Sequence, residues 1–211
     1  MLYNRPLGYG NEANTPNTQV IVVQDYELPY GKGKYFGSHA GAVATALLGG
    51  WRVTGITTFL SGQPFTAAIG AYPSGYAAQN VGIAYPDRGT ASPYAGAAHN
   101  RKQWYQGCST STLSAGTCAA FLLPAANKFG NYGFDDLYGP ININQDLATM
   151  KSIKVTEKYN FTLRTDAFNV FNHANLGQPD ATITDATAGT VTSLAAGANM
   201  RRLQFALRMD F

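Results

Sequence analysis

Charged residues are scarce in this sequence. Asp, Glu, Lys and Arg make up 13% of its 211 residues, against roughly a quarter in ordinary soluble domains. The formal net charge is only +3, and the basic residues are scattered along the chain. No basic patch of the kind that binds nucleic acid is therefore predicted.

Long apolar runs are also missing. The most apolar patch, residues 40–48, is far shorter than the roughly 18 residues that a transmembrane helix needs. The first six residues, Met1 to Pro6, lack the basic region and apolar core of a signal peptide. A protein of the outer membrane must be exported, so if the chain is one, we expect it to lack its natural beginning.

Residues for catalysis or metal binding are few. His39, His99 and His173 fall in separate segments without metal-ligand spacing, and no set of nucleophile, base and acid stands out. The sequence therefore predicts no enzyme activity, no metal and no cofactor. Cys108 and Cys118 lie ten residues apart in a Ser-, Thr- and Gly-rich stretch, and a disulfide between them is expected if the chain is exported.

What the sequence has in abundance is glycine and aromatic residues, with 23 Gly, 13 Tyr and 11 Phe. Apolar and polar residues alternate in several segments, and this period of two is typical of strands. We expect an all-β fold, an antiparallel meander of five to six long strands. The segments with this pattern are residues 18–28, 51–60, 141–155, 159–171 and 203–211.

The last nine residues show the alternation most clearly. One face is fully apolar, and it consists of Leu203, Phe205, Leu207, Met209 and Phe211. Two interpretations remain open. The strand has the length and pattern of a membrane barrel strand, with lipid on one face and the lumen on the other, or it is a half-buried strand of a soluble sandwich.

The connections between these strands differ greatly in length. Residues 65–140 and 172–202 form two long polar connections, whereas a tight turn is expected near Thr156 and Glu157. If the last strand runs inward, both long connections fall on the outer side, as in bacterial outer-membrane barrels. Residues 31–50 then connect two strands on the inner side, with a short helical piece expected at 40–48.

Five charged residues fall on the polar faces of the expected strands and would face the barrel lumen. They could form a ladder of charge pairs between neighbouring strands, or they could line a substrate path. These residues are Arg52, Arg164, Asp166, Arg208 and Asp210.

Several stretches resemble a known family. Residues 50–56 read Gly-Trp-Arg-Val-Thr-Gly-Ile, and residues 60–66 read Leu-Ser-Gly-Gln-Pro-Phe-Thr. Phe129-Gly130-Asn131 and Asn144-Gln145-Asp146-Leu147 follow. Residues 164–173 read Arg-Thr-Asp-Ala-Phe-Asn-Val-Phe-Asn-His, with Asp166 where Glu is usual. Together these motifs resemble TonB-dependent outer-membrane receptors, specifically the Oar-like type with a carboxypeptidase-regulatory-like N-terminal domain.

The resemblance implies a place in the cell outer membrane and a role in transport. Such receptors are barrels of about 22 strands with a plugged lumen, and they carry iron chelates, oligosaccharides or peptides. Residues 1–211 would be a single partial domain, the C-terminal part of such a barrel, with a long outer loop at about 65–140. Five strands cannot close a barrel, so we expect a fragment.

The resemblance also implies partners. Outer-membrane lipid would contact the barrel wall, and the barrel assembly machinery would read the last strand and Phe211. TonB would act only through an N-terminal region that this chain lacks. The alternative is a secreted β-sandwich that serves as a binding or adhesion module. The outward face of each strand distinguishes the two, because it must be apolar in the barrel and polar in the sandwich.

Overall fold

The computed structural model describes residues 9–13, 15–70, 85–125, 128, 130–156 and 158–211. These residues form two compact units. One unit is a sheet formed by Gln19–Phe59, Ile143–Ala174 and Ala198–Phe211. The other contains the described parts of Met1–Thr18, Leu60–Asn142 and Asn175–Gly197. Met1 to Pro6, Phe129 and Glu157, which the sequence singled out, lie outside the described residues.

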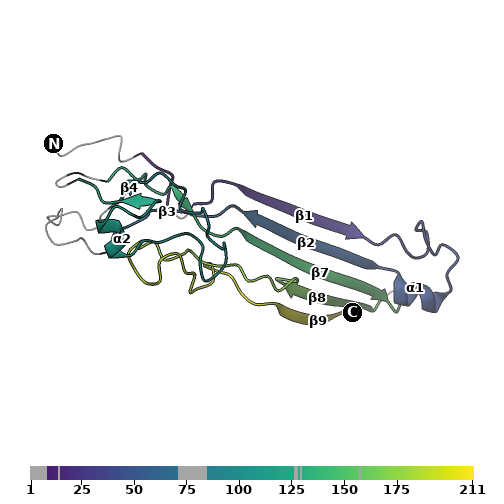
Figure 1. The fold of residues 1–211 in the computed structure, drawn as a ribbon. Coiled ribbons are helices and arrows are strands. Elements are labelled where there is room, and N and C mark those ends of the chain that lie inside the picture. Colours follow the sequence, from purple (N-terminus) through teal and green to yellow (C-terminus); the bar gives the residue numbers. More distant parts are fainter. Residues whose placement is uncertain (1–8, 14, 71–84, 126–127, 129, 157) are drawn as a thin grey trace. The chain divides into compact units, whose positions relative to one another are not determined.

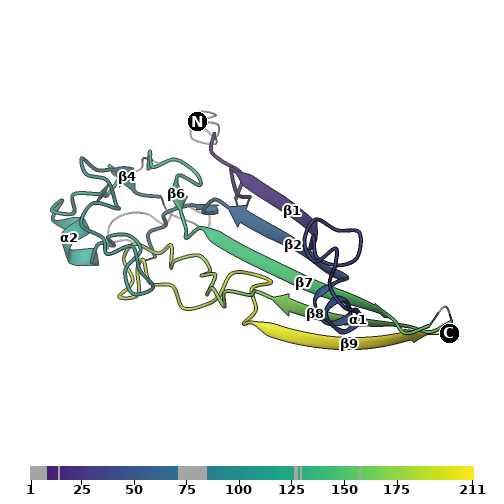
Figure 2. The ribbon, with the colours of Figure 1, turned by 90° about the vertical axis from the view of Figure 1, so that its right-hand side faces the viewer.

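The sheet has five strands in the order β1-β2-β7-β8-β9 (Figures 1 and 2). It is antiparallel and open, and each strand lies beside its neighbour, which confirms the predicted meander. Their bounds are β1 Gln19–Glu27, β2 Trp51–Leu60, β7 Asn142–Lys154, β8 Asn160–Phe168 and β9 Arg202–Asp210.

The fourth strand is shorter than its alternation suggested. The sequence predicted a strand to Phe171, but β8 ends at Phe168. Asn169 and Asn172 have φ angles of 48° and 53°, in the left-handed region that asparagine tolerates better than most residues. A strand needs negative φ angles, so these two residues end it.

The connection between β1 and β2 contains the helix α1, Ala42–Leu48, which confirms the short helical piece expected there. It lies at the end of the sheet where β2 begins and β7 ends (Figure 1). In the described part of the chain, no helix combines the length and the apolar character needed to cross a membrane.

The two long connections fold together into the second unit. In the residues of this unit that the structure describes, the helices and strands are short. β3 Pro64–Phe65 pairs with β6 Leu137–Tyr138, β4 Asp87–Arg88 pairs with β5 Phe121–Leu122, and α2 spans Thr110–Ser114. The amide of Ile183 donates to the carbonyl of Ala68 at 2.8 Å, and the amide of Cys108 donates to the carbonyl of Ile183 at 2.7 Å. These bonds join residues of the connection after β2 to residues of the connection after β8.

This unit has a hydrophobic core of its own, whose members are at most 6% exposed. Alternation cannot reveal such a core because each of its strands has only two residues. The described residues of the stretch predicted as a long outer loop are therefore packed around buried side chains. The largest core side chains that are less than 2% exposed are Tyr105, Leu113, Phe121, Leu137 and Ile183.

Candidate functional site

One face of the sheet is apolar and exposed. Strand pairing places Thr165 beside Phe205 and Leu163 beside Leu207, so these side chains share a face. The side chain of Phe205 is 69% exposed and that of Leu207 is 71% exposed. A soluble sandwich would bury such a face under a second sheet, whereas a barrel wall presents it to lipid. The exposure favours the barrel.

The opposite face carries the charged residues that the sequence predicted to face the lumen. Arg52 on β2 and Asp25 on β1 form a two-point contact, in which Arg52 Nε donates to Asp25 Oδ1 at 2.7 Å and Arg52 Nη2 donates to Oδ2. These two residues line a shallow depression together with Glu27, Ser152 and Thr162. Gly50 and Met150 complete the lining, so the depression combines charged and hydroxyl side chains with an apolar part.

The predicted ladder of charge pairs between strands differs from what the structure shows. Arg164 bonds Asp166 on the same strand, with its Nε at 2.9 Å and 3.0 Å from the two carboxylate oxygens. Arg208 likewise bonds Asp210 at 2.7 Å. The register explains this, because Arg164 faces Ala206 and Asp166 faces Gln204 across to β9.

Arg52 is the one predicted lumen charge whose described ion pair crosses to another strand, and its partner Asp25 was not singled out from the sequence. Pairing the first two strands as an antiparallel hairpin would have revealed it. The amide of Leu28 donates to the carbonyl of Trp51, and the amide of Ser61 donates to the carbonyl of Thr18. This register brings Asp25 within reach of Arg52.

A buried asparagine organises the motif at residues 164–173. Asn169 is 5% exposed. Its Nδ2 donates to the carbonyls of His173 and Asn199 at 2.9 Å and 2.8 Å, and its Oδ1 accepts from the amide of His173 at 2.9 Å. The amide of Asn169 donates to Asp146 Oδ1 at 2.8 Å. The motif thus ties the end of β8 to β7 and to the segment that leads into β9.

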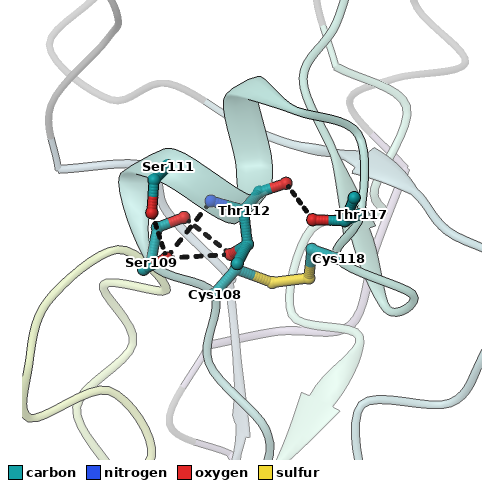
Figure 3. The surroundings of a disulfide bond; sticks show 6 residues. All are labelled: Cys108, Ser109, Ser111, Thr112, Thr117 and Cys118. Atoms are coloured by element: carbon teal, nitrogen blue, oxygen red, sulfur yellow. Dashed lines mark hydrogen bonds between the residues drawn. A yellow bond between two sulfur atoms is a disulfide. The ribbon is translucent and has the colours of Figure 1, made fainter.

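A disulfide joins Cys108 and Cys118 in the second unit, with α2 inside the loop that it closes (Figure 3). Ser109 caps this helix, because its hydroxyl oxygen accepts from the amide of Thr112 at 3.2 Å. The hydroxyl of Thr117 donates to the carbonyl of Thr112 at 3.2 Å. The sequence segment between the cysteines is therefore a small folded element.

Beside the disulfide lies a polar groove. Its lining is rich in amide and hydroxyl groups and contains one carboxylate, and such groups bind ligands that donate and accept several hydrogen bonds. The polar side chains of the lining are Gln103, Gln106, Ser109, Thr110, Ser111, Thr184 and Asp185. The sequence did not single out this groove, because its residues come from both long connections.

Tyr105 and Tyr132 are buried in the core of this unit. Burial raises the pKa of Tyr105, whose hydroxyl donates to the carbonyl of Asp180 at 2.5 Å. Burial, and to a lesser degree the nearby Asp136, raises the pKa of Tyr132 to about 12. Both phenols stay protonated at neutral pH. In the part of the chain that the structure describes, no group of three His, Cys, Asp or Glu side chains gathers as metal ligands would.

Comparison with known proteins identifies one family. A family model described as an outer membrane beta barrel domain matches residues 2–204. No curated protein and no solved structure matches the chain. The matched range includes four of the five long strands entirely and the beginning of β9.

Proposed function

This chain belongs to the outer membrane beta barrel domain family and is a protein of the outer membrane, and from this premise we propose that it forms the C-terminal wall and the substrate-facing outer loops of a TonB-dependent transporter. The motifs at residues 50–66 and 164–173, which resemble those of Oar-like receptors, support this assignment. The transported substrate would be a small molecule, an oligosaccharide or a peptide.

The observation that carries the proposal is the folding of the two long connections into one unit. Both leave the sheet at the same end, since one follows β2 and the other follows β8. Outer-membrane barrels place their long loops on the outer side. A unit with its own core, a disulfide and a polar groove suits the capture of a ligand before transport.

The polar face of the sheet supports the same proposal. Arg52 with Asp25 and Arg164 with Asp166 form ion pairs on this face, and both arginine side chains are about half exposed. Water inside a barrel lumen solvates such pairs, whereas lipid would not. In the proposed transporter these residues lie along the path of the substrate.

The barrel assembly machinery is the proposed partner of the last strand. The apolar face of β9 and the exposed Phe211 would be its recognition signal. Deletion of Phe211 is expected to reduce the amount of receptor inserted in the outer membrane, measured by protection from protease and by heat-modifiable migration in gels. Insertion at the normal level would contradict this role.

The gene itself tests the assignment to TonB-dependent transport. The DNA upstream of the Met1 codon should continue in frame and encode a plug domain and a TonB-binding segment. Uptake by cells that express this longer protein should then stop when TonB is deleted. A stop codon directly upstream, or uptake that does not depend on TonB, would contradict the proposal.

A further inference from the structure

We propose that the connection between β1 and β2 is a lipid-binding element, in which α1 and the preceding Tyr35 and Phe36 lie in the phospholipid leaflet at the inner rim of the barrel wall. The inference rests on the membrane barrel of the proposed function and adds a site to it. It assigns a role to an inner connection that is far longer than the short turns usual on that side.

The composition of α1 is the first argument. Its sequence is Ala-Val-Ala-Thr-Ala-Leu-Leu, without a charged side chain. Val43 is 73% exposed, Leu47 is 64% exposed and Leu48 is 53% exposed. The hydroxyl of Thr45, the one polar side chain, donates to the carbonyl of Ala40. A helix that is apolar on all sides is normally surrounded by protein or by lipid.

The carbonyl groups at the end of α1 are the second argument. Trp51 Nε1 donates to the carbonyl of Leu47 at 3.1 Å, and Lys151 Nζ donates to the carbonyl of Gly49 at 2.5 Å. In water, solvent satisfies the last carbonyls of a helix, but in lipid the protein must do so. The side chains of Trp51 and Lys151 therefore supply the hydrogen-bond donors that carbonyl groups at a helix end need in the membrane interface.

Continuity with the lipid-facing surface is the third argument. Lys151 lies beside Leu163, and Leu163 lies beside Leu207, so all three share the apolar face of the sheet. Lys151 is 4% exposed, and its Nζ lies 5.0 Å from the centre of the Trp51 ring, on that same face. The end of α1 is therefore bonded to the face that contacts lipid.

The residue types match the interface between lipid and water. Tryptophan, tyrosine and lysine gather at this level of membrane proteins, because rings remain among the lipid and charged groups reach the head groups. Tyr35 is 85% exposed and contacts the ring of Phe36 at 4.8 Å between centres. Lys32, also exposed, can pair with a lipid phosphate.

A fluorescent label at a single position tests this site. Leu47→Cys is labelled with an environment-sensitive dye while the bond between Cys108 and Cys118 stays oxidised. The full chain is placed in vesicles of phosphatidylethanolamine and phosphatidylglycerol, with quenchers either in the lipid or in the water. Leu47 is largely exposed, so the substitution leaves the packing of the sheet intact.

Two matched positions serve as controls: Leu207→Cys on the apolar sheet face, and Lys102→Cys, an exposed residue of the second unit. We expect the lipid quencher to reach the labels at residues 47 and 207. The quencher in the water should reach the label at residue 102 and not the label at residue 47. Quenching from the water at residue 47, with residue 207 still in lipid, would overturn this inference alone.

Two other outcomes would also overturn the inference. A label at residue 47 that neither quencher reaches would mean that protein, and not lipid, covers α1. Labels quenched from the water at both residues 47 and 207 would contradict the membrane barrel itself, and with it the proposed function.

Discussion

At the scale of single residues, Asn169 shows why an asparagine is required at one point of the chain. Its φ of 48° falls where asparagine is tolerated more readily than most side chains. The amide group of its side chain also bonds backbone groups of His173 and Asn199. One side chain thus ends β8 and fixes the segment that leads into β9.

Replacement of this side chain should be costly. Asn169→Ala removes three side-chain hydrogen bonds, and we expect the free energy of unfolding to fall by about 3 kcal/mol, at roughly 1 kcal/mol for each bond. Urea unfolding in detergent micelles measures the loss. Asn172→Ala is the control, because Asn172 has a similar positive φ but is exposed, and the one side-chain bond described for it is from the amide of Arg201. A loss no larger than that of the control would contradict this role.

Tyr132 should make the second unit sensitive to alkali. Its pKa of about 12 in the folded chain exceeds the value of 10 for a free tyrosine. The folded state therefore favours the protonated phenol, so the stabilisation is complete below pH 10 and is lost as the pH rises to 12. Tyr132→Phe should weaken this dependence in a pH series of urea unfolding monitored by near-ultraviolet circular dichroism. An unchanged dependence on pH would contradict the prediction.

At the scale of elements, β9 owes its two faces to strict alternation. Leu203, Phe205, Leu207 and Met209 are exposed on the apolar face. On the opposite face, Gln204 lies beside Asp166 of β8. A strand with these faces suits a barrel wall, where lipid contacts the apolar face and water contacts the polar face.

A charge placed on one face or the other of β9 should have different effects on stability, because one face contacts lipid and the other contacts water. Phe205→Arg puts a guanidinium on the lipid-facing side, and we expect a loss of about 2–4 kcal/mol in the free energy of unfolding from vesicles. Gln204→Arg, one residue away, puts the same group on the polar face beside Asp166 and should have little effect. Equal losses for the two variants would refute the assignment of the faces.

At the scale of the whole molecule, the chain divides into a sheet and a second unit with different sources of stability. The sheet depends on backbone pairing and on lipid around its apolar face. The second unit has a buried core and a disulfide, as small exported folds often do. The two units should therefore respond separately to loss of the disulfide.

Removal of the disulfide tests this division. In the double variant Cys108→Ser with Cys118→Ser, we expect the free energy of unfolding of the second unit to fall by about 3 kcal/mol. The reason is that the unfolded chain regains the entropy that closing a loop of about ten residues had removed. Hydrogen exchange should accelerate near Cys108 and Ile183, whose backbones are bonded, but not in β8 or β9. Ser114→Ala is a control in the same loop. Faster exchange throughout the sheet would contradict the independence of the units.

The sequence by itself determined the strands of the sheet. Alternation is a local property, since successive side chains of a strand point to opposite faces, so five strands and their faces could be predicted without any knowledge of contacts. The helix at Ala42–Leu48 and the cysteine pair were expected for equally local reasons of composition and spacing. The motifs at residues 50–66 and 164–173 pointed to a membrane barrel, and the family match agrees with that coarser assignment.

Only the tertiary structure decided how distant segments meet. The bond between Arg52 and Asp25 depends on the register of two strands, and the polar groove depends on residues from two connections that are far apart in the chain. The core of the second unit packs around strands of two residues, which leave no period in the sequence. The contacts of α1 with Trp51 and Lys151 likewise join separate strands. A local pattern specifies the conformation of a segment, but its neighbours are set by packing of the whole chain.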